Sequence, residues 1–76
     1  MNGNVKGAVV GRSRDGRNGY DATIYYKSGR PTRGEDIGIN RIRNYFLSRE
    51  VSLDRITING DRMKSKERRN LEKELS

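Results

Sequence analysis

The N-terminal part of the chain alternates between apolar and polar residues in the manner of a β-hairpin. Within residues 20–27 every second position is apolar, namely Tyr20, Ala22, Ile24 and Tyr26. This period-two pattern predicts a strand with one buried face, which leaves Tyr25 on the opposite, uncovered face. A short apolar run at residues 8–10 precedes it, and an Asp-Gly and an Asn-Gly pair between the two runs favour chain reversal. We therefore expect an antiparallel hairpin over residues 5–27.

The pattern becomes helical after Pro31, which interrupts the strand because it cannot donate to a sheet ladder. Further along, the apolar residues recur at helical spacing: Ile39, Ile42, Tyr45 and Phe46. Thr32 and Glu35 have the spacing of a capping box, and acidic residues suit the positive end of a helix dipole. We expect a helix over about residues 35–49. Gly38 weakens its first turn by about 1 kcal/mol relative to Ala, which leaves a later start as the alternative.

The C-terminal part predicts one more strand and one more helix. A short β-branched segment favours a strand over about residues 53–58, which Asn59 and Gly60 end. Strong helix formers then predict a helix over about residues 62–75 with Asp61 as its N-cap. One face of this helix is apolar at Met63, Leu71 and Leu75. Glu67 interrupts that face, so we expect loose docking. The expected fold class is α+β, a small β-β-α-β-α domain whose three-stranded sheet is covered by one or two helices.

Composition limits the core and excludes several chemistries. Leu, Ile, Val and Phe supply only 15 of 76 residues, close to the level of about 20% below which highly charged chains stay disordered. The core is therefore thin, and a homodimer that shares core surface is left open. The chain has no Cys and no His, which removes disulfides, thiolate and zinc chemistry, histidine bases and the usual catalytic triads.

The net charge of +7 is concentrated on particular segments. Residues 1–18 carry +3, residues 19–34 carry +2 and residues 63–76 carry +2, whereas residues 35–62 balance to zero. Clustered Lys and Arg neutralise phosphates, and the planar guanidinium fork suits phosphate or guanine contacts. An aromatic ring on an uncovered sheet face offers stacking to unpaired bases. The candidate nucleic-acid-binding residues are Arg12, Arg14, Arg17, Tyr25, Lys27, Arg30, Arg33, Lys64, Lys66 and Arg68.

Other functional classes have little support in the sequence. The adjacent carboxylates Glu35 and Asp36 already have an explanation at a helix start, and no metal-binding cluster or phosphate-loop motif is present. We expect no enzyme activity, no cofactor and no metal. The N-terminal segment is too short and too interrupted for a signal peptide or a membrane span, so we expect a cytoplasmic protein without membrane contact.

Two functions remain. The first is a small nucleic-acid-binding protein that contacts the phosphate backbone through its arginine-rich hairpin and loops, with RNA and DNA both open. The alternative is a non-catalytic protein-binding regulator or inhibitor, of the type that phages and mobile elements encode. Such a protein would dock on an acidic protein surface or in a nucleic-acid channel of a host complex. A subunit that orders on joining a ribonucleoprotein is a third, structural reading. Each charged loop also has the simpler explanation of a solvated surface.

Overall fold

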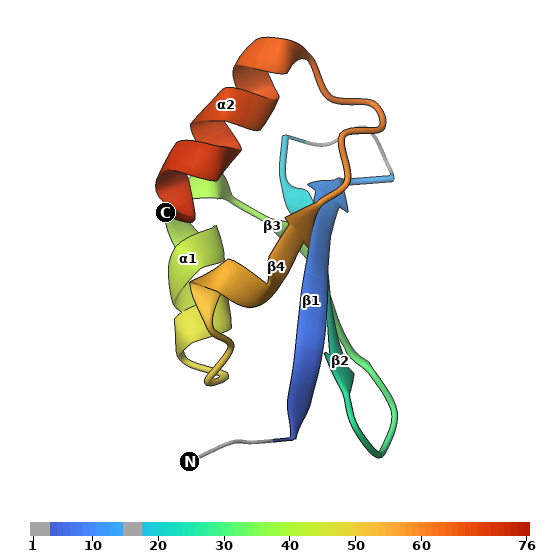
Figure 1. The fold of residues 1–76 in the computed structure, drawn as a ribbon. Coiled ribbons are helices and arrows are strands. Elements are labelled where there is room, and N and C mark those ends of the chain that lie inside the picture. The colour runs from blue at the N-terminus through green and yellow to red at the C-terminus, as the bar shows by residue number, and fades with distance from the viewer. Residues whose placement is uncertain (1–3, 15–17) are drawn as a thin grey trace.

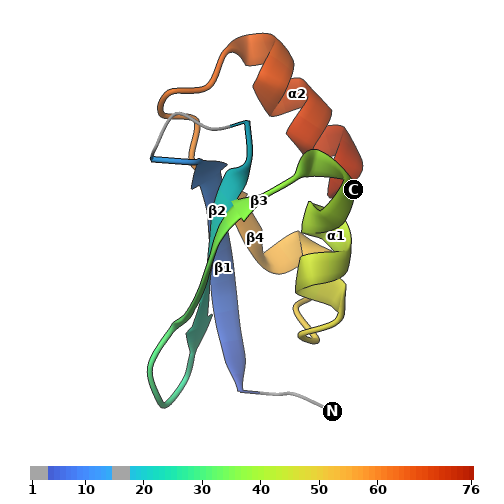
Figure 2. The same cartoon turned by 180° about the vertical axis from the view of Figure 1, so that it is seen from behind.

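The structure describes residues 4–14 and 18–76. In the computed structural model these residues form a four-stranded sheet with two helices against one of its faces (Figures 1 and 2). The elements in chain order are β1 (Val5–Arg12), β2 (Tyr20–Tyr26), β3 (Thr32–Ile37), α1 (Ile39–Leu47), a 3-10 turn (Leu53–Arg55), β4 (Ile56–Ile58) and α2 (Ser65–Glu74). The spatial order of the strands is β3-β2-β1-β4. The α+β class is as predicted, with one more strand than expected.

The predicted hairpin is present. Strands β1 and β2 pair antiparallel from Val5 opposite Tyr26 to Arg12 opposite Tyr20, with a register shift between Val5 and Gly7. The apolar residues of the alternating pattern face inward, and Tyr20, Ala22 and Ile24 are buried, whereas Tyr25 is 43% exposed. The predicted Asp-Gly turn at residues 15–16 lies outside the described residues.

The segment that was expected to start the first helix is instead strand β3. It pairs antiparallel with β2, so its backbone N–H and C=O groups are hydrogen-bonded in the sheet. At the start of a helix, the first N–H groups would instead depend on side-chain caps. The N–H of Asp36 donates to Asp21 Oδ1 at 3.2 Å, and Asp36 has a φ of 54°, where the register with β2 shifts. The predicted capping box of Thr32 and Glu35 is therefore wrong. Helix α1 begins only at Ile39 and ends at Leu47.

Close contact between β3 and α1 explains why the strand lies there. A Cβ atom on Gly34 would lie 2.7 Å from Cζ of Tyr45, so only a glycine leaves room for this ring. The ring of Tyr45 also meets that of Phe46 edge to face, with centroids 5.5 Å apart. The helical stripe predicted for α1 is confirmed, because Ile42 and Phe46 are fully buried.

The C-terminal elements are shorter than predicted. The expected strand over residues 53–58 begins with a 3-10 turn, and only Ile56–Ile58 pair, parallel to β1. Helix α2 begins at Ser65, after Lys64 and not after Asp61, whose N–H donates to Asn59 Oδ1.

Helix α2 docks on the core, since Leu71 is fully buried and Leu75 is 6% exposed. No helix in the described ranges is long and apolar enough to cross a membrane. The two helices cover the same face of the sheet and leave its opposite face open.

Candidate nucleic-acid interface

The open face of the sheet has an unusually bare central strand. Residues directly opposite each other in a sheet share a face, so the pairing of Tyr25 with Gly7 places Gly7, Val9 and Gly11 of β1 on the open face. Thr23 and Tyr25 of β2 flank them on one side, and Thr57 of β4, opposite Val9, flanks them on the other. Because two of the three central residues lack a side chain, the middle of this face is low between its neighbours. We call this strip the β1 trough.

Two surface hollows lie along the β1 trough and meet at Val9. The first has a volume of about 260 Å³ and lies at the end where β1 leads into the hairpin turn. The second has a volume of about 430 Å³ and lies at the other end, beside Tyr25. The charged side chains that line them are Arg12, Arg14, Asp21, Arg33, Asp61 and Arg62 in the first, and Lys6 and Arg55 in the second.

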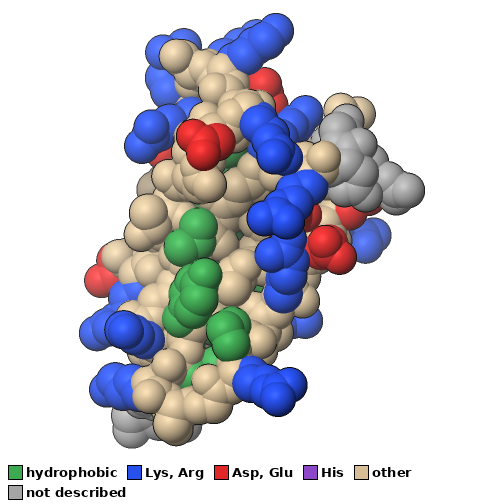
Figure 3. Space-filling model, turned by 90° about the vertical axis from the view of Figure 1, so that its right-hand side faces the viewer, with side chains coloured by type: hydrophobic (Ala, Val, Ile, Leu, Met, Phe, Trp, Pro, Cys, Tyr) green, Lys and Arg blue, Asp and Glu red, His purple; other side chains and the backbone are tan. Residues whose placement is uncertain are grey.

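Basic groups dominate this lining, with six described basic residues against two acidic ones. Lys6, Arg14, Arg55 and Arg62 are exposed, and none has a carboxylate within ion-pair distance in the described part of the chain. Figure 3, which looks onto this side of the molecule, shows hydrophobic side chains in the middle with lysine and arginine on both sides. The arrangement suits an anionic chain that runs over a partly apolar floor.

Three of the predicted contact residues are engaged within the protein. Arg12 Nη1 lies 3.3 Å from Glu67 Oε2 and donates to the carbonyl of Asn18, and its guanidinium lies 5.6 Å from the ring centre of Tyr20. Arg12 therefore joins the end of β1 to α2, and Glu67, which interrupts the apolar face of the helix, is its partner. In addition, Arg33 pairs with Asp21 and Glu35, and Arg68 pairs with Glu72.

The remaining predicted residues fall into separate groups. Arg14 and Tyr25 lie at opposite ends of the β1 trough, while Arg17 lies outside the described residues. Lys27 and Arg30 are exposed in the turn between β2 and β3, beyond the Tyr25 end. The start of α2 carries Lys64 and Lys66 on the helical side of the sheet (Figure 1). The predicted residues thus do not form one surface.

Sequence reasoning missed three basic residues of the open face, Lys6, Arg55 and Arg62. Arg55 and Arg62 belong to the segment 35–62, whose charges cancel when they are counted along the chain. The fold brings both of them to the rim of the β1 trough, where Arg55 lines one hollow and Arg62 lines the other, beside Asp61. Arg62 also has a φ of 62°, an unfavourable conformation for a residue with a side chain. The sequence signal that could have pointed to this face of the sheet is the alternation of Gly7, Val9 and Gly11.

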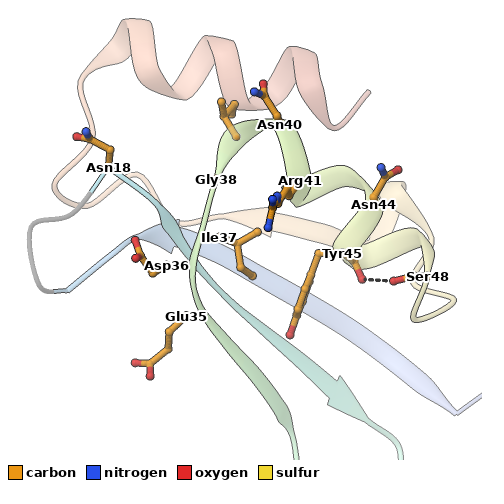
Figure 4. A pocket seen from close by; sticks show the side chains of 11 residues that line it. Asn18, Glu35, Asp36, Ile37, Gly38, Asn40, Arg41, Asn44, Tyr45 and Ser48 are labelled. Carbon is orange, nitrogen blue, oxygen red and sulfur yellow. Dashed lines mark hydrogen bonds between the residues drawn. The ribbon is translucent and has the colours of Figure 1, made fainter.

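A larger hollow of about 940 Å³ lies between β3 and α1 (Figure 4). Ile37 and Tyr45 lie in it, whereas Glu35 and Asp36 point to the other side of β3 and Asn44 points outward. Its polar groups therefore do not converge on one position, and its charges are mixed. In the described residues no group of three or more carboxylates is placed to hold a metal ion.

Comparison with known proteins adds no assignment: no family model matches the chain, and no curated protein or solved structure matches it. The geometry and the charge of the open face are therefore the features that bear on function.

Proposed function

We propose that this protein binds nucleic acid through the open face of its sheet, with the β1 trough as the floor and Lys6, Arg14, Arg55 and Arg62 as the phosphate contacts. The observation that carries the proposal is that these four basic side chains lie unpaired, among the described residues, around a sheet face that no helix covers. Phosphate contacts provide affinity and little sequence preference. This mode of binding needs no cofactor and no catalytic group.

Salt dependence of binding tests this proposal. Each neutralised phosphate contributes about 0.7–0.9 to the slope of log affinity against log salt concentration, so four contacts predict a slope of about −3 to −4. We expect labelled oligonucleotides to bind at about 50 mM salt, as measured by fluorescence anisotropy, and to dissociate as salt is raised. Absence of binding at that salt concentration, or a flat salt response, would contradict the proposal.

A matched pair of triple variants locates the surface. Arg14→Ala, Arg55→Ala and Arg62→Ala together should reduce the magnitude of the slope by about 2–3 and lower the affinity by about tenfold or more. The control removes the same charge from the helices through Arg41→Ala, Arg69→Ala and Lys73→Ala, and should retain most of the affinity. Equal losses in both variants would show that net charge alone attracts the ligand.

The alternative of a protein-binding regulator uses the same basic surface, since opposite charges also steer protein association. A purified stoichiometric protein partner that resists nuclease treatment, and that the open-face triple variant releases, would favour this alternative. A partner that is lost on nuclease treatment would favour nucleic acid.

A further inference from the structure

The fold itself does not require both glycines of the β1 trough. A Cβ atom on Gly11 would lie 3.4 Å from Cβ of Asn59, and one on Gly7 would lie 3.5 Å from the carbonyl oxygen of Arg55, which are ordinary contacts. By contrast, a Cβ on Gly19 would lie 2.8 Å from Cα of Asp36, so the fold needs a glycine there. Gly7 adjoins the register shift in β1, which makes Gly11 the clearer case.

Glycine in the interior of a strand weakens it, because the residue loses more conformational freedom on folding and contributes no packing. Where neither a positive φ nor a close neighbour requires it, such a glycine marks a place where another molecule approaches the backbone closely. Gly11 lies in a central strand, its φ is not positive, and its outward side faces the first hollow. The bare backbone therefore indicates a ligand that lies down on the strand.

The width of the β1 trough restricts that ligand. The flanking strands β2 and β4 each lie about 4.8 Å from β1, so the trough is roughly 10 Å across, and the distance from Gly7 to Gly11 is about 13 Å. A duplex is too wide to reach this floor and would touch only the basic rims. A single strand fits, and at a stacked rise of about 3.4 Å the trough holds about four nucleotides.

Resting on the proposed function, we infer that the open face takes single-stranded nucleic acid, with one base stacked on Tyr25 and the backbone following β1 toward Arg14 and Arg62. Tyr25 is 43% exposed and borders the second hollow, where its ring is accessible to an unpaired base. Aromatic platforms in a basic groove are the usual means of binding single strands without sequence preference. The basic residues at both ends of the trough neutralise the phosphates on either side of the stacked base.

Anisotropy titrations with labelled single strands and with a duplex test this inference. The probes are oligothymidine and oligouridine of about 12 nucleotides and a DNA duplex of similar length, all at about 50 mM salt. We expect at least about tenfold tighter binding of one of the single strands than of the duplex. Tyr25→Ala should weaken single-strand binding by between about 5- and 150-fold, whereas Tyr25→Phe should retain it.

Filling the trough provides the second arm of the test. Gly11→Val should weaken single-strand binding by about tenfold or more and leave duplex binding unchanged, since a duplex does not reach the floor. Gly11→Ala serves as the milder variant in case valine disturbs Asn59. The matched control is Gly38→Val, because Gly38 is also extended, has open space around its Cβ position and lies outside the trough. Thermal melts of each variant show that the fold is retained.

The possible outcomes separate the two proposals. Equal binding of single strands and duplex, with no effect of the Gly11 and Tyr25 variants, would overturn the single-strand inference and leave nucleic-acid binding standing. Failure of every probe to bind would overturn the proposed function, and the inference with it.

Discussion

Arg12 and Arg14 are two residues apart at the same end of the hairpin, yet the structure predicts opposite consequences for their removal. Arg12 is held by Glu67, by the carbonyl of Asn18 and by the ring of Tyr20, whereas Arg14 is exposed and has no ion-pair partner among the described residues. Sequence reasoning places both in the binding site, whereas the structure gives Arg12 a role in holding the end of β1 to α2.

The loss of stability in Arg12→Ala follows from these contacts. Its side chain is 22% exposed and that of Glu67 is 30% exposed, so the ion pair is only partly screened and contributes about 1 kcal/mol. The contact with Tyr20 adds about 0.5–1 kcal/mol. We expect a total loss of about 1.5–2 kcal/mol out of a free energy of unfolding of about 4–11 kcal/mol for a chain of this length. The melting temperature should fall by roughly 6–15 °C.

Urea and thermal unfolding followed by circular dichroism measure this loss. Arg14→Ala is the matched control and should change stability by no more than about 0.5 kcal/mol. A double-mutant cycle of Arg12→Ala with Glu67→Gln should give a coupling energy of about 1 kcal/mol. The N–H of Lys64 also donates to Glu67, and the cycle cancels any change in this contact because it occurs in both variants that carry Glu67→Gln. Equal stability of the two arginine variants, or a coupling energy below about 0.3 kcal/mol, would refute this reasoning.

Three further predictions concern the packing and the backbone. Gly34→Ala should lower stability by about 1–3 kcal/mol in urea unfolding because Tyr45 must move, and a neutral result would mean that β3 is not held as described. Arg62→Gly should leave the free energy of unfolding unchanged or raise it by up to about 1 kcal/mol, since it relieves a φ of 62°, while oligonucleotide affinity falls in anisotropy titrations. A clear loss of stability would show that the arginine supports the turn. Phe46→Ala should cost about 3–5 kcal/mol and leave much of the chain unfolded by circular dichroism, because the ring is fully buried. Retention of a cooperative melt near the parent temperature would contradict the assigned core.

Local patterns were enough to identify several elements. The alternation in β2 predicted both the inward face of the hairpin and the exposure of Tyr25, since side chains of a strand alternate between its faces whatever packs against them. The spacing of Ile42 and Phe46 predicted the buried face of α1, since residues four positions apart lie on the same side of a helix. The excess of basic residues and the absence of Cys and His are properties of the composition and need no fold.

Strand β3 could not be read from its own residues. Its polar sequence resembles a helix start, and only pairing with β2 and the fit of Tyr45 against Gly34 make it a strand. Charge pairing is equally non-local: Arg12 and Glu67 are far apart in sequence, so only the docking of α2 shows that Arg12 is engaged.

The chain by itself therefore determined the signs of the charges, the faces of β2 and α1, and the lack of Cys and His chemistry, because these follow from composition or from residues that are close in sequence. The tertiary structure decided which face of the sheet stays open, which arginines remain unpaired around it, and that Lys6, Arg55 and Arg62 line it together. Those properties depend on contacts between distant segments, which the order of residues along the chain does not display.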